Sequence, residues 1–259
     1  MKNLRIALAQ TRLYWEHPEA NRNHFEKLFA SFPKGSCDLI LLPEMFSTGF
    51  TMNAPAVAET MDGPTATWMK YMAKKHKAVF CGSVVIKEKG RYFNRLLWVT
   101  PDGTILKYDK RHLFRMAKEE QTYSSGQQRL IVELKGWKIC PLICYDLRFP
   151  VWCRNTESFD LQLFVANWPS RRKFAWKQLL VARAIENQCF VAGLNRVGKD
   201  GSGYAYSGDS IVHGPAGETI LKMQANSSGV AVAELDFQVL KTFRKAFPVA
   251  LDRDTFQIK

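Results

Sequence analysis

The feature that most constrains this chain is a series of short apolar runs of strand length that alternate with segments of helical periodicity. The first run, Leu4–Gln10, is followed by a segment at 18–32 whose apolar residues recur at helical spacing. The next run, 38–43, is continuously apolar, which is typical of a strand buried on both faces. This alternation predicts a layered α/β fold.

Later segments add hairpins to this pattern. Pro101, Asp102 and Gly103 form a strong turn signal between two apolar strands, so the flanking strands are expected to be antiparallel. Strands are predicted at 79–86, 92–100, 137–144, 161–167, 189–195, 208–213 and 229–235, and helices at 65–75 and 173–188. No linker, low-complexity tract or internal repeat interrupts the series. We therefore predict one domain over 1–259, with sheets that are not all parallel.

The charge and the apolar content exclude several classes of protein. The formal net charge is +13, but lysines and arginines are spread along the chain and no nucleic-acid-binding motif accompanies them. The charge is better explained by a solvated surface that attracts small anionic substrates. No apolar run approaches the ~18 residues of a membrane span, and the N-terminus does not resemble a signal peptide. We predict a cytoplasmic protein that binds neither nucleic acid nor membrane.

Three polar residues stand where predicted strands stop. Glu44 ends DLILLPE, Lys110 follows ILKYD, and Cys144 ends KICPLIC. Ligands of open α/β sheets bind beyond strand ends, so these side chains can converge on one cleft. Amide cleavage needs a nucleophile, a proton shuttle and a charge stabiliser, and a thiol, a carboxylate and an ammonium can supply them.

Each of these residues alone has an ordinary explanation, as surface charge or a core cysteine, and only their combination indicates catalysis. His112 could pair with Cys144 as a cysteine–histidine dyad, or pack beside the site. Asp146 and Arg148 are expected to form an ion pair or to orient the turn after Cys144. The spacings of Cys140, Cys144 and Cys153 match no common zinc pattern, so no metal is predicted.

The segments LLPEMF, YDKRHLF and LICYDLRFP resemble, in order, the three signature blocks of the nitrilase superfamily of carbon–nitrogen hydrolases. The resemblance covers essentially the whole chain. It implies a four-layer α-β-β-α sandwich with mixed sheets, assembly into a homodimer, and a catalytic triad without a cofactor. That triad would consist of Glu44 as general base, Lys110 as oxyanion stabiliser and Cys144 as nucleophile.

The resemblance also implies supporting residues. Family members often place a second glutamate in the loop after the lysine block, and Glu119 matches it better than Glu120. The family commonly has a glycine just before that glutamate, where this chain has Lys118. The backbone N–H of Tyr145 would be the second oxyanion donor.

Within the superfamily, the segment 168–188 and the ending FRKAFPVALDRD are similar to the ω-amidases, which deamidate 2-oxoglutaramate and 2-oxosuccinamate. Such a small amide carries a carboxylate, which a positive pocket would favour. The expected substrate contacts are Tyr145, Phe46, Trp168, Arg171, Arg172 and His112. A carbamoylase, an aliphatic amidase or a nitrilase could use the same triad, and a basic binding module on this fold is the non-enzymatic alternative.

Overall fold

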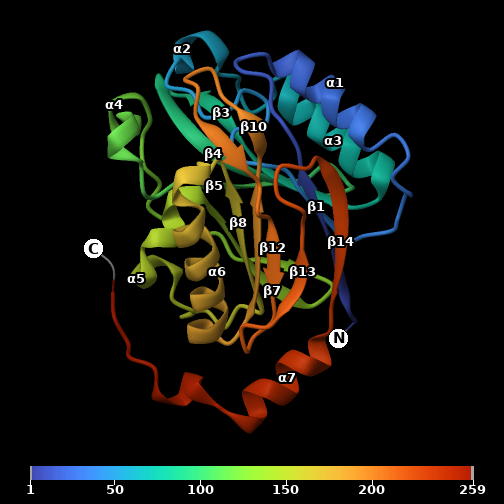
Figure 1. Ribbon diagram of the computed structural model, residues 1–259, viewed down its shortest axis with the longest axis vertical. Helices are drawn as coiled ribbons and strands as arrows, with labels where there is room; N and C mark the ends of the chain where they lie inside the picture. Colours follow the sequence, from blue (N-terminus) through green and yellow to red (C-terminus); the bar gives the residue numbers. More distant parts are fainter. Residues whose placement is uncertain (1, 258–259) are drawn as a thin grey trace.

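The computed structural model describes residues 2–257, which form two six-stranded sheets packed face to face (Figure 1). In spatial order the first sheet contains β14 (Gly229–Leu235), β1 (Leu4–Gln10), β2 (Leu39–Leu41), β3 (Val79–Glu88), β4 (Arg91–Val99) and β5 (Ile105–Asp109). The second contains β13 (Thr219–Lys222), β12 (Ile211–His213), β9 (Phe190–Asn195), β8 (Leu161–Ala166), β7 (Trp137–Ile143) and β6 (Val132–Leu134).

Both sheets are mixed, as predicted. Strands β1, β2 and β3 are parallel, and so are β7, β8 and β9, whereas antiparallel strands flank each parallel group. The turn at 101–103 joins β4 to β5 in the predicted hairpin, in which Val99 pairs with Ile105. Strand β14 returns from the end of the chain to pair with β1 along its whole length, which ties the two ends of the sequence together.

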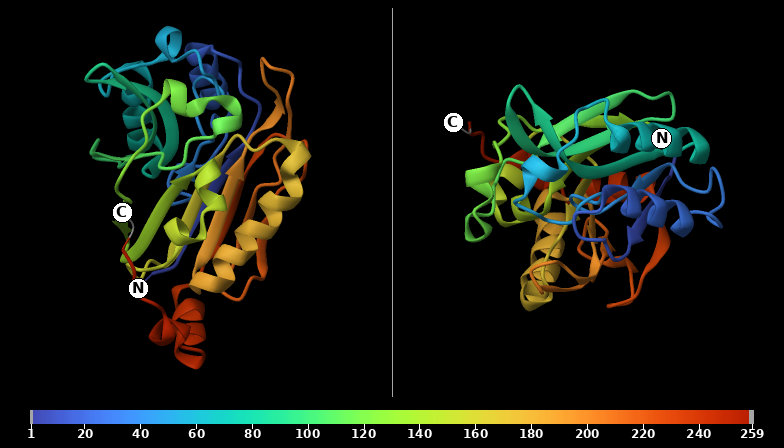
Figure 2. Two further views of the ribbon diagram at one scale, coloured as in Figure 1. Left: turned by 90° about the vertical axis from the view of Figure 1, so that its left-hand side faces the viewer. Right: turned by 90° about the horizontal axis from the view of Figure 1, so that it is seen from above.

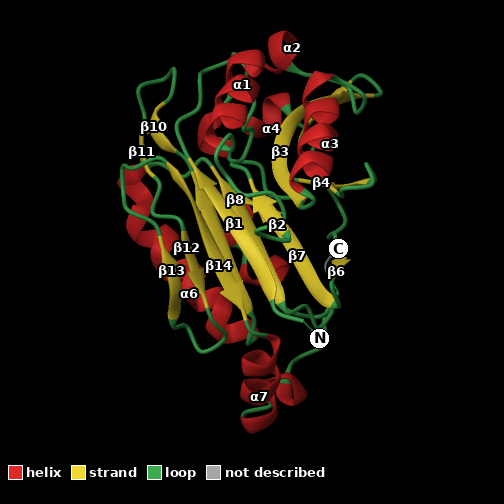
Figure 3. Cartoon of the chain, turned by 90° about the vertical axis from the view of Figure 1, so that its right-hand side faces the viewer, coloured by secondary structure: helices red, strands yellow, loops and turns green. Residues whose placement is uncertain are grey.

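Helices cover the outer face of each sheet (Figures 2 and 3). Helices α1 (Pro18–Leu28) and α3 (Pro64–His76) cover the first sheet, and α6 (Lys173–Asn187) covers the second. The four-layer α-β-β-α sandwich is therefore confirmed. None of the helices in the described part of the chain is long and apolar enough to cross a bilayer. The remaining elements are α2 (Ala54–Val57), α4 (Glu119–Thr122), α5 (Pro150–Cys153), α7 (Phe237–Ala246), β10 (Val197–Lys199), β11 (Ala205–Ser207) and the 3₁₀ helices η1 (Arg115–Ala117), η2 (Cys144–Arg148), η3 (Ser170–Arg172) and η4 (Val249–Asp252).

Two apolar cores follow from this layering. One lies between the sheets and under α6, and includes Leu8 of β1 and Leu142 of β7. The other lies between the first sheet and helices α1 and α3, and is rich in aromatic side chains. All six cysteines are buried as free thiols, which agrees with their apolar sequence context.

Some element boundaries differ from the predicted ones, and backbone conformation explains the differences that matter for the site. The strand expected at 208–213 begins only at Ile211, because Gly208 and Asp209 adopt positive φ angles of 73° and 57°. The strand expected at 137–144 ends at Ile143, because Cys144 has a φ of 42° and begins η2. The small β10–β11 hairpin and α7 were not predicted.

The aromatic core contains a histidine that has a consequence for acid stability. His76, at the end of α3, is 3 % exposed and lies against the rings of Phe29, Phe32 and Phe80 at centroid distances of 5.7–6.3 Å. Among the described residues, neither ring nitrogen has a hydrogen-bond partner. Burial lowers the pKa of His76, and the charges of Lys75 and Lys34 lower it further.

We expect His76 to make the folded protein sensitive to mild acid. The unfolded chain binds the proton more tightly, so the stabilisation from neutral His76 is present above about pH 6.5 and is lost as the pH falls below it. The His76→Leu variant should therefore show a smaller decrease in melting temperature between pH 7.5 and pH 5.5 than the unchanged protein. Thermal unfolding followed by circular dichroism measures this difference, with the exposed His17→Leu as control. Identical pH dependence in all three proteins would contradict the assignment.

Candidate active site

Cys144 lies at a sharp turn between a strand and a 3₁₀ helix. Strand β7 ends at Ile143, Cys144 has a φ of 42°, and η2 begins at Cys144 itself. A side chain other than glycine is strained in this left-handed region, and such strain concentrates at functional sites. The same strand–turn–helix geometry presents the nucleophile of other hydrolases. The thiol is 8 % exposed, so it is almost enclosed but lines a cavity.

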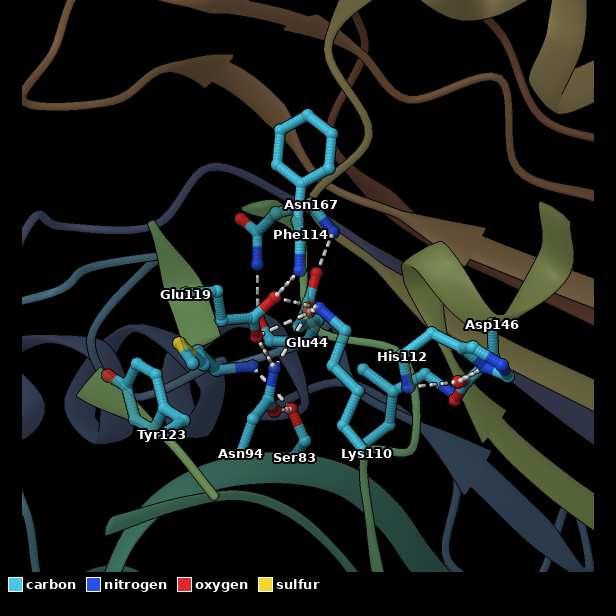
Figure 4. A network of polar contacts seen from close by, with 12 residues as sticks. Glu44, Ser83, Asn94, Lys110, His112, Phe114, Glu119, Tyr123, Asp146 and Asn167 are labelled. Carbon is cyan, nitrogen blue, oxygen red and sulfur yellow. Dashed lines mark hydrogen bonds and ion pairs between the residues drawn. The ribbon is translucent and has the colours of Figure 1, made fainter. Parts of the chain in front are cut away.

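Asp146 orients this turn. Its Oδ2 accepts hydrogen bonds from the Ile143 amide at 3.1 Å and the Tyr108 hydroxyl at 2.7 Å. Its Oδ1 accepts from the backbone of His112 at 3.0 Å and lies 2.8 Å from His112 Nδ1 (Figure 4). The role in orienting the turn is thus confirmed, but the expected ion pair with Arg148 is wrong, because Asp146 bonds to His112 and Tyr108 instead.

A buried ion cluster faces the turn from the first sheet (Figure 4). Lys110, which follows β5, donates from Nζ to Glu44 Oε1 at 2.8 Å and to both carboxylate oxygens of Glu119, at 3.0 Å and 2.9 Å. All three side chains are at most 1 % exposed. The structure therefore brings Glu119 to Lys110, whereas Glu120 lies 4.0 Å from Arg115 and outside the cluster.

The residue before Glu119 explains the glycine that the family commonly has there. Lys118 has a φ of 58°, a conformation that glycine adopts without strain and that other residues rarely adopt. The Glu119 carboxylate also accepts the backbone N–H of Phe114 at 2.6 Å, which closes the loop around it. Lys118 therefore adopts the backbone conformation that favours glycine, and the loop still closes around Glu119.

Three residues that sequence reasoning missed complete the cluster. The Asn94 amide donates to Glu44 Oε1 at 2.8 Å and to Glu119 Oε1 at 3.2 Å, and Ser83 donates to Asn94 Oδ1 at 2.8 Å. The backbone N–H of Asn167 donates to Glu44 Oε2 at 2.9 Å. Asn167 directly follows strand β8, which is the signal that singled out Glu44. Asn94 interrupts an apolar strand, so an isolated polar residue there was the available signal.

The electrostatics follow from two carboxylates sharing one ammonium in a buried space. Burial alone would lower the pKa of Lys110, but the charges of Glu119 and Glu44 outweigh it and raise this pKa, so the ammonium is retained. Burial raises the pKa of Glu119, and the Glu44 charge adds to that rise against the opposing charge of Lys110. Burial and then the Glu44 charge raise the pKa of the Cys144 thiol well above its usual value, while Lys110 opposes this. The thiol therefore needs a base.

Cys144, Glu44 and Lys110 lie at the inner end of a cavity of about 390 Å³. Its wall includes the predicted contacts Tyr145, Trp168, Arg171 and Arg172, together with Arg148. Sequence reasoning missed the aromatic part of the wall, to which Trp15, Phe50, Phe114, Tyr204 and Tyr206 contribute. Among the described residues, no group of three or more His, Cys, Asp or Glu side chains is arranged to hold a metal ion.

Two predicted substrate contacts lie away from the cavity wall. Phe46 is fully buried in the aromatic core, with ring centroids 5.6 Å from Phe25 and 5.8 Å from Trp68. His112 stacks on Phe149 at 3.7 Å and faces Asp146, so it packs beside the site and does not form a dyad with Cys144. Direct substrate contact by these two residues is therefore not supported.

Comparison with known proteins agrees with the hydrolase chemistry that this geometry indicates. The family model for carbon-nitrogen hydrolases matches residues 5–245. The chain is 46% identical over 258 residues to the omega-amidase YafV of Escherichia coli (strain K12), with 100% of both proteins covered. It is 36% identical over 249 residues to the 2-oxoglutaramate amidase of Bacillus subtilis (strain 168), covering 94% of this chain and 95% of that protein.

A solved structure shows the same fold. The crystal structure of XC1258 from Xanthomonas campestris, a CN-hydrolase superfamily protein, superimposes with a TM-score of 0.97 at 47% identity, over 100% of both chains. The family predicted from the three sequence blocks is thereby confirmed. From its sequence and its fold alike, the chain belongs to the carbon-nitrogen hydrolase family.

Proposed function

We propose that this protein is an ω-amidase, which hydrolyses the terminal amide of a small 2-oxo acid to the 2-oxo acid and ammonia. The observation that carries the proposal is a cavity that joins a buried thiol–carboxylate–ammonium cluster to three arginines, none of which pairs with a carboxylate of the described chain. The printed names of the Escherichia coli and Bacillus subtilis relatives, an omega-amidase and a 2-oxoglutaramate amidase, support the same substrate class.

The chemistry at the inner end of the cavity divides among three side chains and one backbone N–H. Cys144 Sγ attacks the amide carbonyl carbon while its proton passes to Glu44. Lys110 and the Tyr145 N–H stabilise the oxyanion of the tetrahedral intermediate. When the C–N bond breaks, Glu44 returns the proton to the departing nitrogen, so ammonia leaves and a thioester remains on Cys144. Water, deprotonated by Glu44, then attacks the thioester and releases the carboxylic acid and the thiol.

The outer part of the cavity suits an anionic group. The guanidinium groups of Arg148, Arg171 and Arg172 lie 4.9, 4.6 and 5.2 Å from aromatic ring centroids, and within residues 2–257 none of them pairs with a carboxylate. Burial lowers the pKa of Arg172, and the neighbouring charges of Arg171 and Arg148 lower it further. A bound carboxylate would reduce the electrostatic repulsion among these three guanidinium groups.

Besides Glu44 at the inner end, Asp200 lines the outer part of the cavity, and its oxygens already accept hydrogen bonds. Asp200 accepts hydrogen bonds from the backbone of Ser202 and Tyr204, both at 2.9 Å, and from the Tyr206 hydroxyl at 2.7 Å. Asp200 thus holds the β10–β11 hairpin together at the cavity wall. The three arginines outnumber this single aspartate, so the net charge of the outer cavity is positive.

We expect ammonia release from 2-oxoglutaramate and 2-oxosuccinamate to exceed that from a carboxylate-free amide of similar length. A charge-assisted hydrogen bond contributes roughly 1.5–3 kcal/mol, so kcat/KM should differ by about 10- to 100-fold or more. A coupled ammonia assay at equal substrate concentrations measures this. If an N-carbamoyl compound or a nitrile is turned over in preference to both 2-oxo amides, the substrate class is wrong. No turnover of any of these compounds would favour the non-enzymatic alternative.

Matched charge variants are the control for this assay. Arg148→Gln, Arg171→Gln and Arg172→Gln should each raise KM for the 2-oxo amide more than for the carboxylate-free amide. Arg91→Gln removes the same charge from the exposed start of β4, away from the cavity, and should change neither. Equal effects of all four variants would mean that the overall charge, and not the arginine cluster, attracts the substrate.

A further inference from the structure

The carboxamide of Asn94 lies between the two carboxylates of the buried cluster. It is fully buried on β4, and its Nδ2 donates to Glu44 Oε1 at 2.8 Å and to Glu119 Oε1 at 3.2 Å (Figure 4). An amide nitrogen carries two hydrogens, so both are used by these two acceptors. Asn94 therefore links the proposed base directly to the second glutamate.

Ser83 sets which way the Asn94 amide faces. The backbone N–H of Met45 donates to Ser83 Oγ at 2.7 Å, and Ser83 Oγ donates in turn to Asn94 Oδ1 at 2.8 Å. The hydroxyl hydrogen thus points at the carbonyl oxygen of Asn94, and the NH₂ group faces the glutamates. A flipped amide would place its oxygen against two carboxylates, which is unfavourable because all three are acceptors.

Counting acceptors on Glu44 identifies the atom that can take a proton. A carboxylate oxygen offers about two lone-pair sites. Oε1 fills both, with Lys110 Nζ and Asn94 Nδ2, each at 2.8 Å. Oε2 accepts only the Asn167 N–H, at 2.9 Å, among its protein donors in the described chain. One acceptor site is therefore left on Glu44, and it belongs to Oε2.

We propose that Asn94, held by Ser83, is a positioning residue that fixes the orientation of the Glu44 and Glu119 carboxylates and makes Glu44 Oε2 the atom that takes and returns the Cys144 proton. The inference deepens the proposed function, since it rests on Glu44 acting as the base. It assigns a role in proton transfer to a residue that touches neither the thiol nor the cavity wall.

The proposal predicts a displaced pH profile. Hydrogen bonding to the charged form of a carboxylate favours that form, and Asn94→Ala removes one such donor from each of two carboxylates. In Asn94→Ala the acid limb of the pH profile should move to higher pH, and kcat should fall about tenfold or more at pH 7, with KM changed less than about twofold. A merely structural role would lower activity without moving the acid limb.

The first readout is the rate at which iodoacetamide alkylates Cys144 in the full-length protein between pH 4.5 and pH 8. The extent of alkylation is measured by mass spectrometry after the protein has been digested to peptides. Asn155→Ala is the matched control, because Asn155 is also buried and its side chain makes three hydrogen bonds, to Phe159 O, Asn187 O and Phe159 N. We expect the acid limb to move in Asn94→Ala and to stay in Asn155→Ala. An unmoved limb in Asn94→Ala, or equal shifts in both variants, would overturn the proposal.

Asn94→Asp provides a second test if the alanine variant does not fold. It keeps the shape of the side chain and the Ser83 contact but replaces the donor with an acceptor, so the acid limb should move at least as far. An unchanged limb in Asn94→Asp would equally overturn the proposal. Alkylation requires no substrate. Failure of the 2-oxo amide assay would therefore contradict the proposed function, and the alkylation result would still test the role of Asn94.

Discussion

Replacing Cys144 with alanine is expected to reduce ammonia release by at least about 10⁴-fold, to a level near the uncatalysed reaction. Loss of the nucleophile in a hydrolase that forms a covalent intermediate removes the whole acylation route, and such losses are typically of this size or larger. The measurement is single-substrate turnover of 2-oxoglutaramate. Accumulation of a thioester on the unchanged protein, followed by mass spectrometry, should also vanish in Cys144→Ala.

The enclosed position of Cys144 adds a pH dependence to this prediction. Burial and the charge of Glu44 raise the pKa of its thiol, so the resting group is the thiol and not a free thiolate. Activity should therefore not rise through the titration of an ordinary cysteine near pH 8.5, and kcat at pH 7 and pH 8.5 should agree within about twofold. A steep rise over this range would indicate that a free thiolate attacks without help from Glu44.

Cys140→Ala is the matched control, because Cys140 lies on β7, the strand that leads into Cys144, is fully buried and faces no described part of the cavity. It should keep kcat within about threefold while losing some stability from the missing sulfur. Equal turnover by Cys144→Ala and the unchanged protein would mean that Cys144 is not the nucleophile. A similar loss in both variants would instead point to damage to β7.

The sequence was sufficient to predict the layers and the ionic part of the site. Short apolar runs of strand length indicate buried strands, and Glu44 and Cys144 each follow such a run, whereas Lys110 follows β5, which is only partly buried. Their convergence depends on both sheets presenting strand ends to the same place, and the Asn167–Glu44 hydrogen bond shows that β8 and β2 meet there. Strand ends of this kind can be recognised from the local sequence.

The cavity wall was predicted less well, because it is assembled from loops whose path depends on tertiary packing. Phe46 and Phe50 both follow Glu44 closely, yet Phe46 packs into the aromatic core while Phe50 lies on the wall, with Lys110 Nζ 5.0 Å from its ring centroid. Trp15 and Tyr204 come from distant segments that no motif connects to the site. Asn94 was overlooked because a polar residue within an apolar strand reveals its partners only once the sheets are packed.

Replacing Lys110 with methionine is expected to affect both stability and activity strongly. The variant leaves two carboxylates in a space where all three side chains are at most 1 % exposed, and removing one partner of a buried ion pair typically costs about 3–5 kcal/mol. It also removes the proposed donor to the oxyanion, and losses of about 10²–10³ in kcat are typical when such a donor is removed. Denaturant unfolding and the ammonia assay measure the two effects.

The loss of stability in Lys110→Met should depend on pH in a defined direction. Without the ammonium, the charge that opposes the raised pKa of Glu119 is gone, so the folded chain holds a proton there at pH values where the unfolded chain has released it. A carboxyl group with a raised folded pKa loses stabilisation as the pH rises above its unfolded value of about 4.3. The variant should therefore be closest to the unchanged protein near pH 5 and fall furthest behind near pH 8.

A second substitution separates the two effects of Lys110. Lys110→Met combined with Glu119→Gln removes one carboxylate along with the ammonium, so no pair of like charges remains and most of the lost stability should return. Activity should not return, because the charge that stabilises the oxyanion is still missing. If the double variant recovers turnover together with stability, Lys110 acts only by neutralising the glutamates. If Lys110→Met alone keeps its stability at pH 8, the cluster does not carry the charges that its geometry requires.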